Sequence, residues 1–189
     1  MIIIHKIFCV LGRTGVGKSV ITNKAAHKLD LKIVKSYTTR KMRRGEADEK
    51  SDHTFINPED VDQYRDDMVA YTDRVNYCSF ATRQQLLNSD FYIINPTGLY
   101  ELKLKTKDMD IELIPIYINV PYRQTLENAK KRGDLDTWKA NYKKENEEFK
   151  SFEHSDMIRY RILNNGTISQ AVDKLVKIVE KERGKDKTF

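Results

Sequence analysis

Short, mainly apolar runs separated by longer stretches of mixed polarity recur along this sequence of 189 residues. Four of these runs are bounded by turn residues and predict buried strands: Ile7–Leu11, Phe91–Ile94, Ile111–Val120 and Tyr160–Leu163. Runs that are apolar on both sides are typical of parallel strands that are covered on both faces. With helical segments between them, they predict an α/β fold around a parallel core sheet.

Four segments have the composition and periodicity of helices. They are Lys18–Leu29, Pro121–Arg132, Asp136–Phe152 and Thr167–Glu182. The last one carries an apolar stripe at helical spacing, which is interpreted as core packing. On the third, Trp138 is interpreted as a packing residue, and Glu145, Glu147 and Glu148 as a solvated helix face.

Residues 36–89 do not follow the alternation of strand and helix. This stretch carries turn residues, charges and short alternating runs such as Val69–Thr72. It predicts an inserted lobe of small strands with one helix near Pro58–Asp67, following a short strand that ends before Ser36. Asn95-Pro96-Thr97-Gly98, just beyond the lobe, is predicted to be a loop at a strand end.

Residues Gly12–Ser19 fit the pattern G-x-x-x-x-G-K-[ST] of the phosphate-binding P-loop, between a predicted strand and a predicted helix. Glycines there let backbone N–H groups point into one concavity, and the helix N-terminus adds partial positive charge. The motif predicts a nucleoside triphosphate site, with Lys18 at the β- and γ-phosphates and the Ser19 hydroxyl on Mg²⁺.

Composition narrows the class of ligand. The net charge of +6 suits anionic ligands, and the absence of a basic-aromatic platform disfavours specific nucleic-acid binding. Cys9 and Cys78 have neither the number nor the spacing of a disulfide framework or zinc site. No signal-peptide pattern or membrane-length apolar stretch occurs, so a cytoplasmic protein with no membrane partner is expected.

A cluster of arginines follows the P-loop helix. Arg40, Arg43 and Arg44 lie within the segment Ser36–Glu46. Guanidinium groups bind phosphate in a bidentate manner, so the cluster is a candidate site for a phosphate-bearing acceptor. A solvated basic loop explains this segment equally well when it is taken alone.

In combination with the P-loop motif, Ser36–Glu46 resembles the guanylate kinases, whose pattern is S-x-T-T-R-x-x-R-x-G-E. The resemblance continues through Asp52–Ile56, Asn76–Ser79, Lys131–Gly133 and Leu163–Asn165, in order along nearly the whole chain. It implies a three-layer P-loop kinase fold with an inserted nucleoside-monophosphate-binding lobe and a helical lid. The expected division of this single domain, 1–189, is a core of residues 1–35, 90–125 and 155–183, an acceptor-binding lobe of 36–89 and a lid of 126–154.

The resemblance also implies an activity: transfer of the γ-phosphoryl group of ATP to GMP or dGMP, with Mg²⁺, by a monomer or homodimer. The residues implied as catalytic are Lys18, Arg40 and Arg132. Those implied for ATP are Gly12, Thr14, Gly15, Val16, Gly17, Lys18, Ser19 and Asn164, with Ser19 also the Mg²⁺ ligand. Those implied for the acceptor are Ser36, Arg40, Arg43, His53, Tyr77 and Ser79, with Ser36 and Ser79 at the base.

The departures from the family pattern concentrate in the acceptor site. His53 stands in place of a phosphate-binding tyrosine, and Ala70 or Tyr71 in place of a guanine-reading glutamate, for which Asp73 or Glu46 are candidate substitutes. Asn95 and Thr97 replace the two aspartates of a D-x-D motif, and two further lid arginines fall near Asn128 and Lys143. A buried carboxylate discriminates strongly for a guanine edge.

Three hypotheses therefore stay open. The first is a guanylate kinase with a rebuilt base pocket. The second is a kinase of the same fold that acts on another nucleotide or a phosphosugar. The third is a non-catalytic module that binds a phosphorylated ligand, which typically loses the P-loop lysine that this chain keeps as Lys18.

Overall fold

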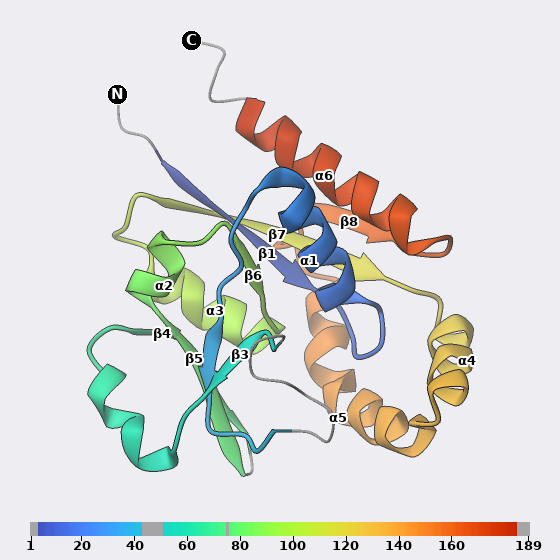
Figure 1. Cartoon of the computed structure of the whole chain (residues 1–189), viewed down its shortest axis with the longest axis horizontal. Coiled ribbons are helices and arrows are strands. Elements are labelled where there is room, and N and C mark those ends of the chain that lie inside the picture. Colours follow the sequence, from blue (N-terminus) through green and yellow to red (C-terminus); the bar gives the residue numbers. More distant parts are fainter. Residues whose placement is uncertain (1–3, 43–50, 75, 185–189) are drawn as a thin grey trace.

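Two four-stranded sheets organise the part of the chain that the computed structural model describes, residues 4–42, 51–74 and 76–184 (Figure 1). The core sheet has the order β6-β1-β7-β8, and its neighbouring strands are all parallel. Its strands are β1 (His5–Leu11), β6 (Phe91–Ile93), β7 (Ile111–Asn119) and β8 (Tyr160–Leu163). The four apolar runs of the sequence are thus confirmed as one parallel sheet.

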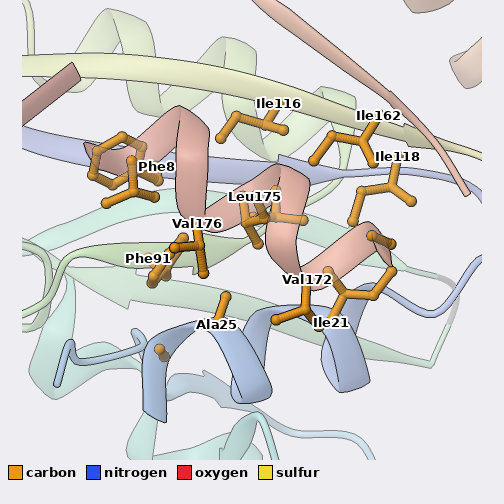
Figure 2. Close-up of a cluster of buried hydrophobic side chains, with 14 of the residues drawn as sticks. Phe8, Ile21, Ala25, Phe91, Ile116, Ile118, Ile162, Val172, Leu175 and Val176 are labelled. Atoms are coloured by element: carbon orange, nitrogen blue, oxygen red, sulfur yellow. The ribbon is translucent and has the colours of Figure 1, made fainter. Parts of the chain in front are cut away.

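Helices cover both faces of this sheet, which confirms the expected three-layer α/β fold. On one face, α1 (Lys18–Leu29) and α6 (Ile168–Gly184) pack together against the strands. Figure 2 shows Ile21 of α1 and Leu175 of α6 directed toward Phe8, Ile116 and Ile162 of the sheet. Full burial of each such side chain contributes about 1.5–3 kcal/mol.

The opposite face is covered by α3 (Pro96–Lys105) and α5 (Leu135–Glu153). Leu99 and Leu102 of α3, with Phe152 of α5, belong to the same buried cluster as Cys9 of β1 and Tyr117 of β7. Because both faces of β1 are buried from Ile7 to Leu11, these five positions are all apolar rather than alternately so.

The second sheet lies within residues 36–89 and has the order β3-β2-β5-β4. Its strands are β2 (Ser36–Thr38), β3 (His53–Phe55), β4 (Met68–Arg74) and β5 (Tyr77–Thr82). β2 is parallel to β3, and the other pairs are antiparallel. A short helix, α2 (Arg83–Leu87), follows β5 from a capping box made by Thr82 and Gln85. Val69 and Leu86 join the buried cluster beneath α3, so the lobe is packed onto the core.

Two predictions for the lobe are wrong. The helix expected near Pro58–Asp67 is replaced by two 3₁₀ turns, η2 (Pro58–Asp60) and η3 (Asp62–Tyr64). Neither turn has a buried residue, so no apolar face rewards a longer helix there. The strand expected before Ser36 is only a bridge from Ile33 to Phe91, and the strand proper, β2, begins at Ser36 and joins the second sheet.

The loop predicted at Asn95–Gly98 is the start of α3 instead. Asn95 is the N-cap residue, since its side-chain oxygen accepts a hydrogen bond from the Gly98 N–H at 2.7 Å, and Pro96 occupies the first helical position. Asparagine and proline are favoured at these positions of a helix as well as in turns, which is why the pattern was ambiguous.

The segment between β7 and β8 forms two helices. α4 (Tyr122–Arg132) ends at Gly133, whose φ of 75° is left-handed, and α5 begins two residues later. Both helices, and α6, lie within two residues of their predicted bounds. Cys9 and Cys78 are buried free thiols. Across the described ranges, every helix is too short or too polar to cross a membrane.

Candidate functional site

The P-loop motif, residues 12–19, curls from the end of β1 into the first turn of α1. Gly15 and Gly17 have φ values of 81° and 91°, a left-handed conformation that favours glycine. Gly12 passes so close to β7 that an added Cβ would lie 2.5 Å from the Ile118 carbonyl oxygen. The motif glycines are therefore required by the backbone path, and α1 begins at Lys18 as predicted.

Lys18 is folded back on the loop. Its ammonium group donates to the carbonyl oxygens of Gly12 at 2.6 Å and Arg13 at 3.0 Å. Burial lowers the pKa of this ammonium, and the carboxylates of Glu145 and Asp52 oppose that shift. The carboxylates of Glu145 and Asp52 thus lie near the Lys18 ammonium group, which is the group that the motif predicts to bind phosphates.

Asp52 is a site residue that the sequence reasoning missed. The Ser19 hydroxyl donates to one carboxylate oxygen of Asp52. Asn23, one turn further along α1, donates to the other at 3.5 Å and to the Ser19 carbonyl oxygen at 2.8 Å. The available signal was the run Asp52–Ile56, whose match to the family pattern was used only for His53.

A cavity of about 180 Å³ opens between the second sheet and the end of β6, and it is called the lobe pocket here. It is lined by Ser36, Arg40, His53, Ala70, Thr72, Tyr77, Ser79, Tyr92, Ile93, Ile94 and Asn95. Five of the six predicted acceptor residues are in this lining. The sixth, Arg43, lies outside the described residues, as does Arg44.

Hydrogen bonds hold the polar side chains of the lobe pocket in place. Ser36 Oγ lies 2.9 Å from His53 Nδ1, which joins β2 to β3. Ser79 Oγ donates to Thr38 Oγ1 at 2.9 Å. The Arg40 guanidinium lies 5.2 Å from the centre of the Phe55 ring and donates to the Lys41 carbonyl oxygen, so it brings positive charge to the rim.

The described lining of the lobe pocket contains hydroxyls, an amide and an imidazole but no carboxylate. Ala70 lies in the wall with a φ of 53°, beside a bulge in the pairing of β4 between Val69 and Thr72. Asp73 is exposed and outside the lining, and Glu46 lies outside the described residues. Burial raises the pKa of the Tyr92 hydroxyl, so this wall group stays neutral at physiological pH.

Asn95 and Thr97, which replace the two aspartates of the family pattern, serve the fold. Asn95 caps α3 and also accepts a hydrogen bond from the Thr72 hydroxyl at 3.4 Å. The Thr97 N–H and hydroxyl both donate to Glu148 of α5, at 2.9 and 2.7 Å. The interpretation of Glu148 as part of a solvated face is therefore wrong.

Helix α5, which lies in the segment that the resemblance implies as a lid, touches the P-loop directly. The Trp138 indole N–H donates to the Thr14 carbonyl oxygen at 3.3 Å and its ring covers Gly15, which confirms that Trp138 is a packing residue. Glu145 accepts a hydrogen bond from the Thr14 N–H at 2.8 Å. The interpretation of Glu145 as part of a solvated helix face is therefore wrong as well. Arg132 is paired with Asp134 at 3.1 Å, and its guanidinium lies near Gly15.

A second contact between α5 and the P-loop is centred on Arg13. Arg13 makes a two-pronged ion pair with Glu153, at 2.8 and 3.1 Å, and lies 4.9 Å from the centre of the Tyr142 ring. Tyr117 of β7 also donates to Glu153. Burial opposes ionisation of Glu153, but hydrogen bonds from Arg13 and Tyr117 outweigh it and hold its pKa below the usual value.

Asn164 is placed differently from what the resemblance implies. It is buried, and its side-chain amide donates to the Val16 carbonyl oxygen at 3.2 Å, so it supports the loop from behind. Asn119, at the end of β7, instead lines a cavity of about 240 Å³ beside the P-loop, together with Arg13, Tyr122 and Tyr142. Both asparagines lie at the edge of the core sheet formed by the carboxyl ends of β7 and β8.

The residues that fit a divalent cation are few. The described ranges contain no group of three or more His, Cys, Asp or Glu side chains that would enclose a metal ion. Ser19 and Asp52 bring two hard oxygen donors together at the start of α1. This donor set fits Mg²⁺, which is usually bound by one or two carboxylates with substrate phosphates and water rather than by a protein cage.

Comparison with known proteins shows a similarity of fold. No protein-family model and no curated protein sequence matches this chain. The crystal structure of guanylate kinase from Anaplasma phagocytophilum superimposes with a TM-score of 0.62, at 18% sequence identity, over 95% of this chain and 85% of that chain. The guanylate kinase-like fold expected from the motifs is thereby confirmed.

Proposed function

We propose that this protein transfers the γ-phosphoryl group of ATP to a nucleoside monophosphate. The observation that carries the proposal is the adjacency of the two candidate sites. Asp52 contacts Ser19 of the P-loop, and the next residue, His53, lines the lobe pocket. Phosphoryl transfer needs a donor and an acceptor aligned in one site and positive charge around them, with no covalent nucleophile.

Each polar group has a role in this reaction. Lys18, with the P-loop backbone, binds the β- and γ-phosphates, and Arg132 reaches the transferring group from the lid. Arg40, Tyr77 and His53 hold the acceptor phosphate, while Ser36 and Ser79 contact the acceptor base. Mg²⁺ held at Ser19 would neutralise the charge that develops on the phosphates.

GMP and dGMP are the first candidates as acceptors, because the motifs and the fold both resemble guanylate kinases. The lobe pocket favours a broader search, since its described lining offers no carboxylate to the guanine N1 and N2 groups. Another nucleoside monophosphate or a phosphosugar is therefore the second candidate. A non-catalytic phospho-ligand module is the third, and the retained Lys18 disfavours it.

The test is an ADP-release assay with MgATP and a panel of GMP, dGMP, AMP, CMP, UMP, dTMP and phosphosugars. Turnover confined to GMP and dGMP would support the guanylate kinase hypothesis, and turnover with another acceptor would support the second. No turnover with any acceptor, while ATP still binds, would contradict a kinase function for this panel and favour the binding module.

Lys18→Ala is the matched control for this assay. Removing a preorganised cation from the transferring phosphates should lower the rate by about 10²–10³-fold. The fold should survive, as judged by an unchanged circular dichroism spectrum, because the two hydrogen bonds given for the lysine both go to carbonyl oxygens of its own loop. Undiminished turnover in this variant would rule out the P-loop as the donor site.

A further inference from the structure

Two carboxylates approach the P-loop from opposite sides, and they are not equivalent. Glu145 of the lid accepts a hydrogen bond from a backbone N–H, that of Thr14. Asp52, which precedes β3 in the lobe, instead contacts the Ser19 hydroxyl, the group that the motif assigns to the metal. Only Asp52 thus places a carboxylate beside a second oxygen donor suited to Mg²⁺.

The two aspartates of the family's D-x-D pattern are replaced here by Asn95 and Thr97. Both of these side chains already make hydrogen bonds within the fold. Asn95 is the N-cap of α3, and Thr97 is bonded to Glu148 through both its N–H and its hydroxyl. A neutral amide oxygen and a hydroxyl are also weaker partners for a divalent cation than a carboxylate. A metal held at Ser19 therefore needs another source of negative charge in this chain.

Asp52 is held in position by its neighbours. The next residue, His53, begins β3, and its N–H donates to Ser51 Oγ at 3.2 Å. Asn23 of α1 points its side-chain amide at the second carboxylate oxygen at 3.5 Å. A carboxylate fixed on both sides has less freedom to lose when it binds an ion.

We propose that Asp52 is the carboxylate that holds Mg²⁺ beside the Ser19 hydroxyl, in place of the aspartates missing at Asn95 and Thr97. The inference rests on the proposed function, because ATP phosphates supply the remaining negative charge. Without metal, Asp52 repels those phosphates. With metal, the cation balances the charge of Asp52 beside the phosphates.

The experiment compares Asp52→Asn with the wild-type full chain, using Mn²⁺ as the probe and a non-hydrolysable ATP analogue. Free Mn²⁺ is measured by electron paramagnetic resonance. Loss of the ligand should weaken Mn²⁺ binding to the protein–nucleotide complex by about tenfold or more. Asp66→Asn, which changes an exposed aspartate of the same lobe, should leave it unchanged, and Asp52→Glu should restore part of it.

A second readout separates metal binding from a purely structural latch between Asp52 and Ser19. Nucleotide affinity is measured by Trp138 fluorescence with Mg²⁺ and with EDTA. Asp52→Asn should bind nucleotide no more weakly than wild type in EDTA and should lose most of the gain that Mg²⁺ brings. Equal weakening under both conditions, or unchanged Mn²⁺ affinity, would overturn the inference.

Failure of the proposed function has a different signature. If the wild-type chain binds the nucleotide analogue and Mn²⁺ but transfers phosphate to no acceptor, the kinase activity is refuted. The Mn²⁺ comparison still decides the role of Asp52 in that case.

Discussion

At the scale of single residues, Arg40 brings a positive charge to the described lining of the lobe pocket. Its loss should weaken the use of the acceptor but not that of ATP. Removing its charge-assisted hydrogen bonds to a phosphate costs about 1.5–3 kcal/mol, so Arg40→Ala should raise the KM of the acceptor by about 10–100-fold. The KM of ATP should change by less than about twofold, since Arg40 lines the lobe pocket and its guanidinium donates to the Lys41 carbonyl oxygen within the lobe.

Steady-state kinetics with each substrate varied in turn measures the difference. Arg40→Lys serves as the control, because lysine keeps the charge but loses the bidentate geometry. Its acceptor KM should lie between those of wild type and Arg40→Ala. Equal losses for ATP and the acceptor would contradict the assignment of Arg40 to the acceptor phosphate.

Single residues were predictable where a motif fixes both their identity and their spacing. The P-loop glycines and Lys18 follow from the sequence because the motif demands a specific backbone and a specific charge, and five residues of the lobe pocket were implied by the resemblance to guanylate kinases. Asp52 and Glu145 did not follow, because their partners lie 33 and 131 residues away and no local pattern records such contacts. The left-handed conformation of Ala70 was equally hidden, since alanine carries no signal for it.

At the scale of elements, the contact of α5 with the P-loop should oppose nucleotide binding. Glu145 places a negative charge on the Thr14 N–H, where the motif would place a phosphate oxygen. Glu145→Gln keeps an acceptor but removes the charge, so ATP affinity should rise by about two- to fivefold, the scale of a partly exposed ionic interaction.

Fluorescence of Trp138, the single tryptophan of the sequence, is a direct reporter because its ring covers Gly15. Glu147→Gln, on the exposed side of the same helix, is the matched control and should leave ATP affinity unchanged. Weaker ATP binding in Glu145→Gln would mean that this carboxylate supports the loop rather than competing with phosphate.

The other end of α5 should be a pH-dependent anchor. Hydrogen bonds from Arg13 and Tyr117 outweigh burial and lower the pKa of Glu153, so its ionised form stabilises the fold above the ordinary glutamate pKa of about 4.3. Glu153→Gln should lower the free energy of unfolding at pH 7 by about 1–3 kcal/mol. The difference from wild type should shrink as the pH falls below about 4.3, because the unfolded chain then takes up a proton at Glu153 more readily than the native state does.

Urea denaturation at pH 7 and at pH 3.5 checks both parts, with Glu147→Gln as the exposed control. A difference that stays constant across this pH range would show that the charge of Glu153 is not what anchors the helix.

Strands were predictable where burial on both faces of the sheet requires a continuous apolar run in the sequence. The core strands β1, β6 and β7 follow from that signal, whereas α6 follows from an apolar stripe at helical spacing and α1 from its place after the P-loop motif. The start of α3 was missed because Asn95 and Pro96 suit a turn and a helix N-terminus equally. The helix expected near residues 58–67 failed for the opposite reason, since helix-compatible residues without a buried face do not form a stable helix.

At the scale of the whole molecule, residues from three segments that are far apart in sequence meet at one loop. The core supplies the P-loop, the lobe brings Asp52 and His53, and the lid brings Trp138 and Glu145. The order of strands and helices along the chain predicts the layers, but this convergence depends on contacts between parts that are far apart in sequence.

This convergence predicts that donor and acceptor stabilise the protein cooperatively. A ligand at about 100 times its Kd adds about 2.7 kcal/mol to the free energy of unfolding, which raises the Tm of a chain of this size by about 5–10 °C. Because Asp52 and His53 are consecutive and face different sites, closure driven by one ligand lessens the cost of binding the other. The acceptor that supports turnover should therefore raise the Tm more in the presence of MgADP than in its absence. The matching nucleoside, which lacks the phosphate for Arg40, should produce little shift under either condition. Thermal denaturation with each ligand and with both measures the coupling, and strictly additive shifts would show that the two sites bind independently.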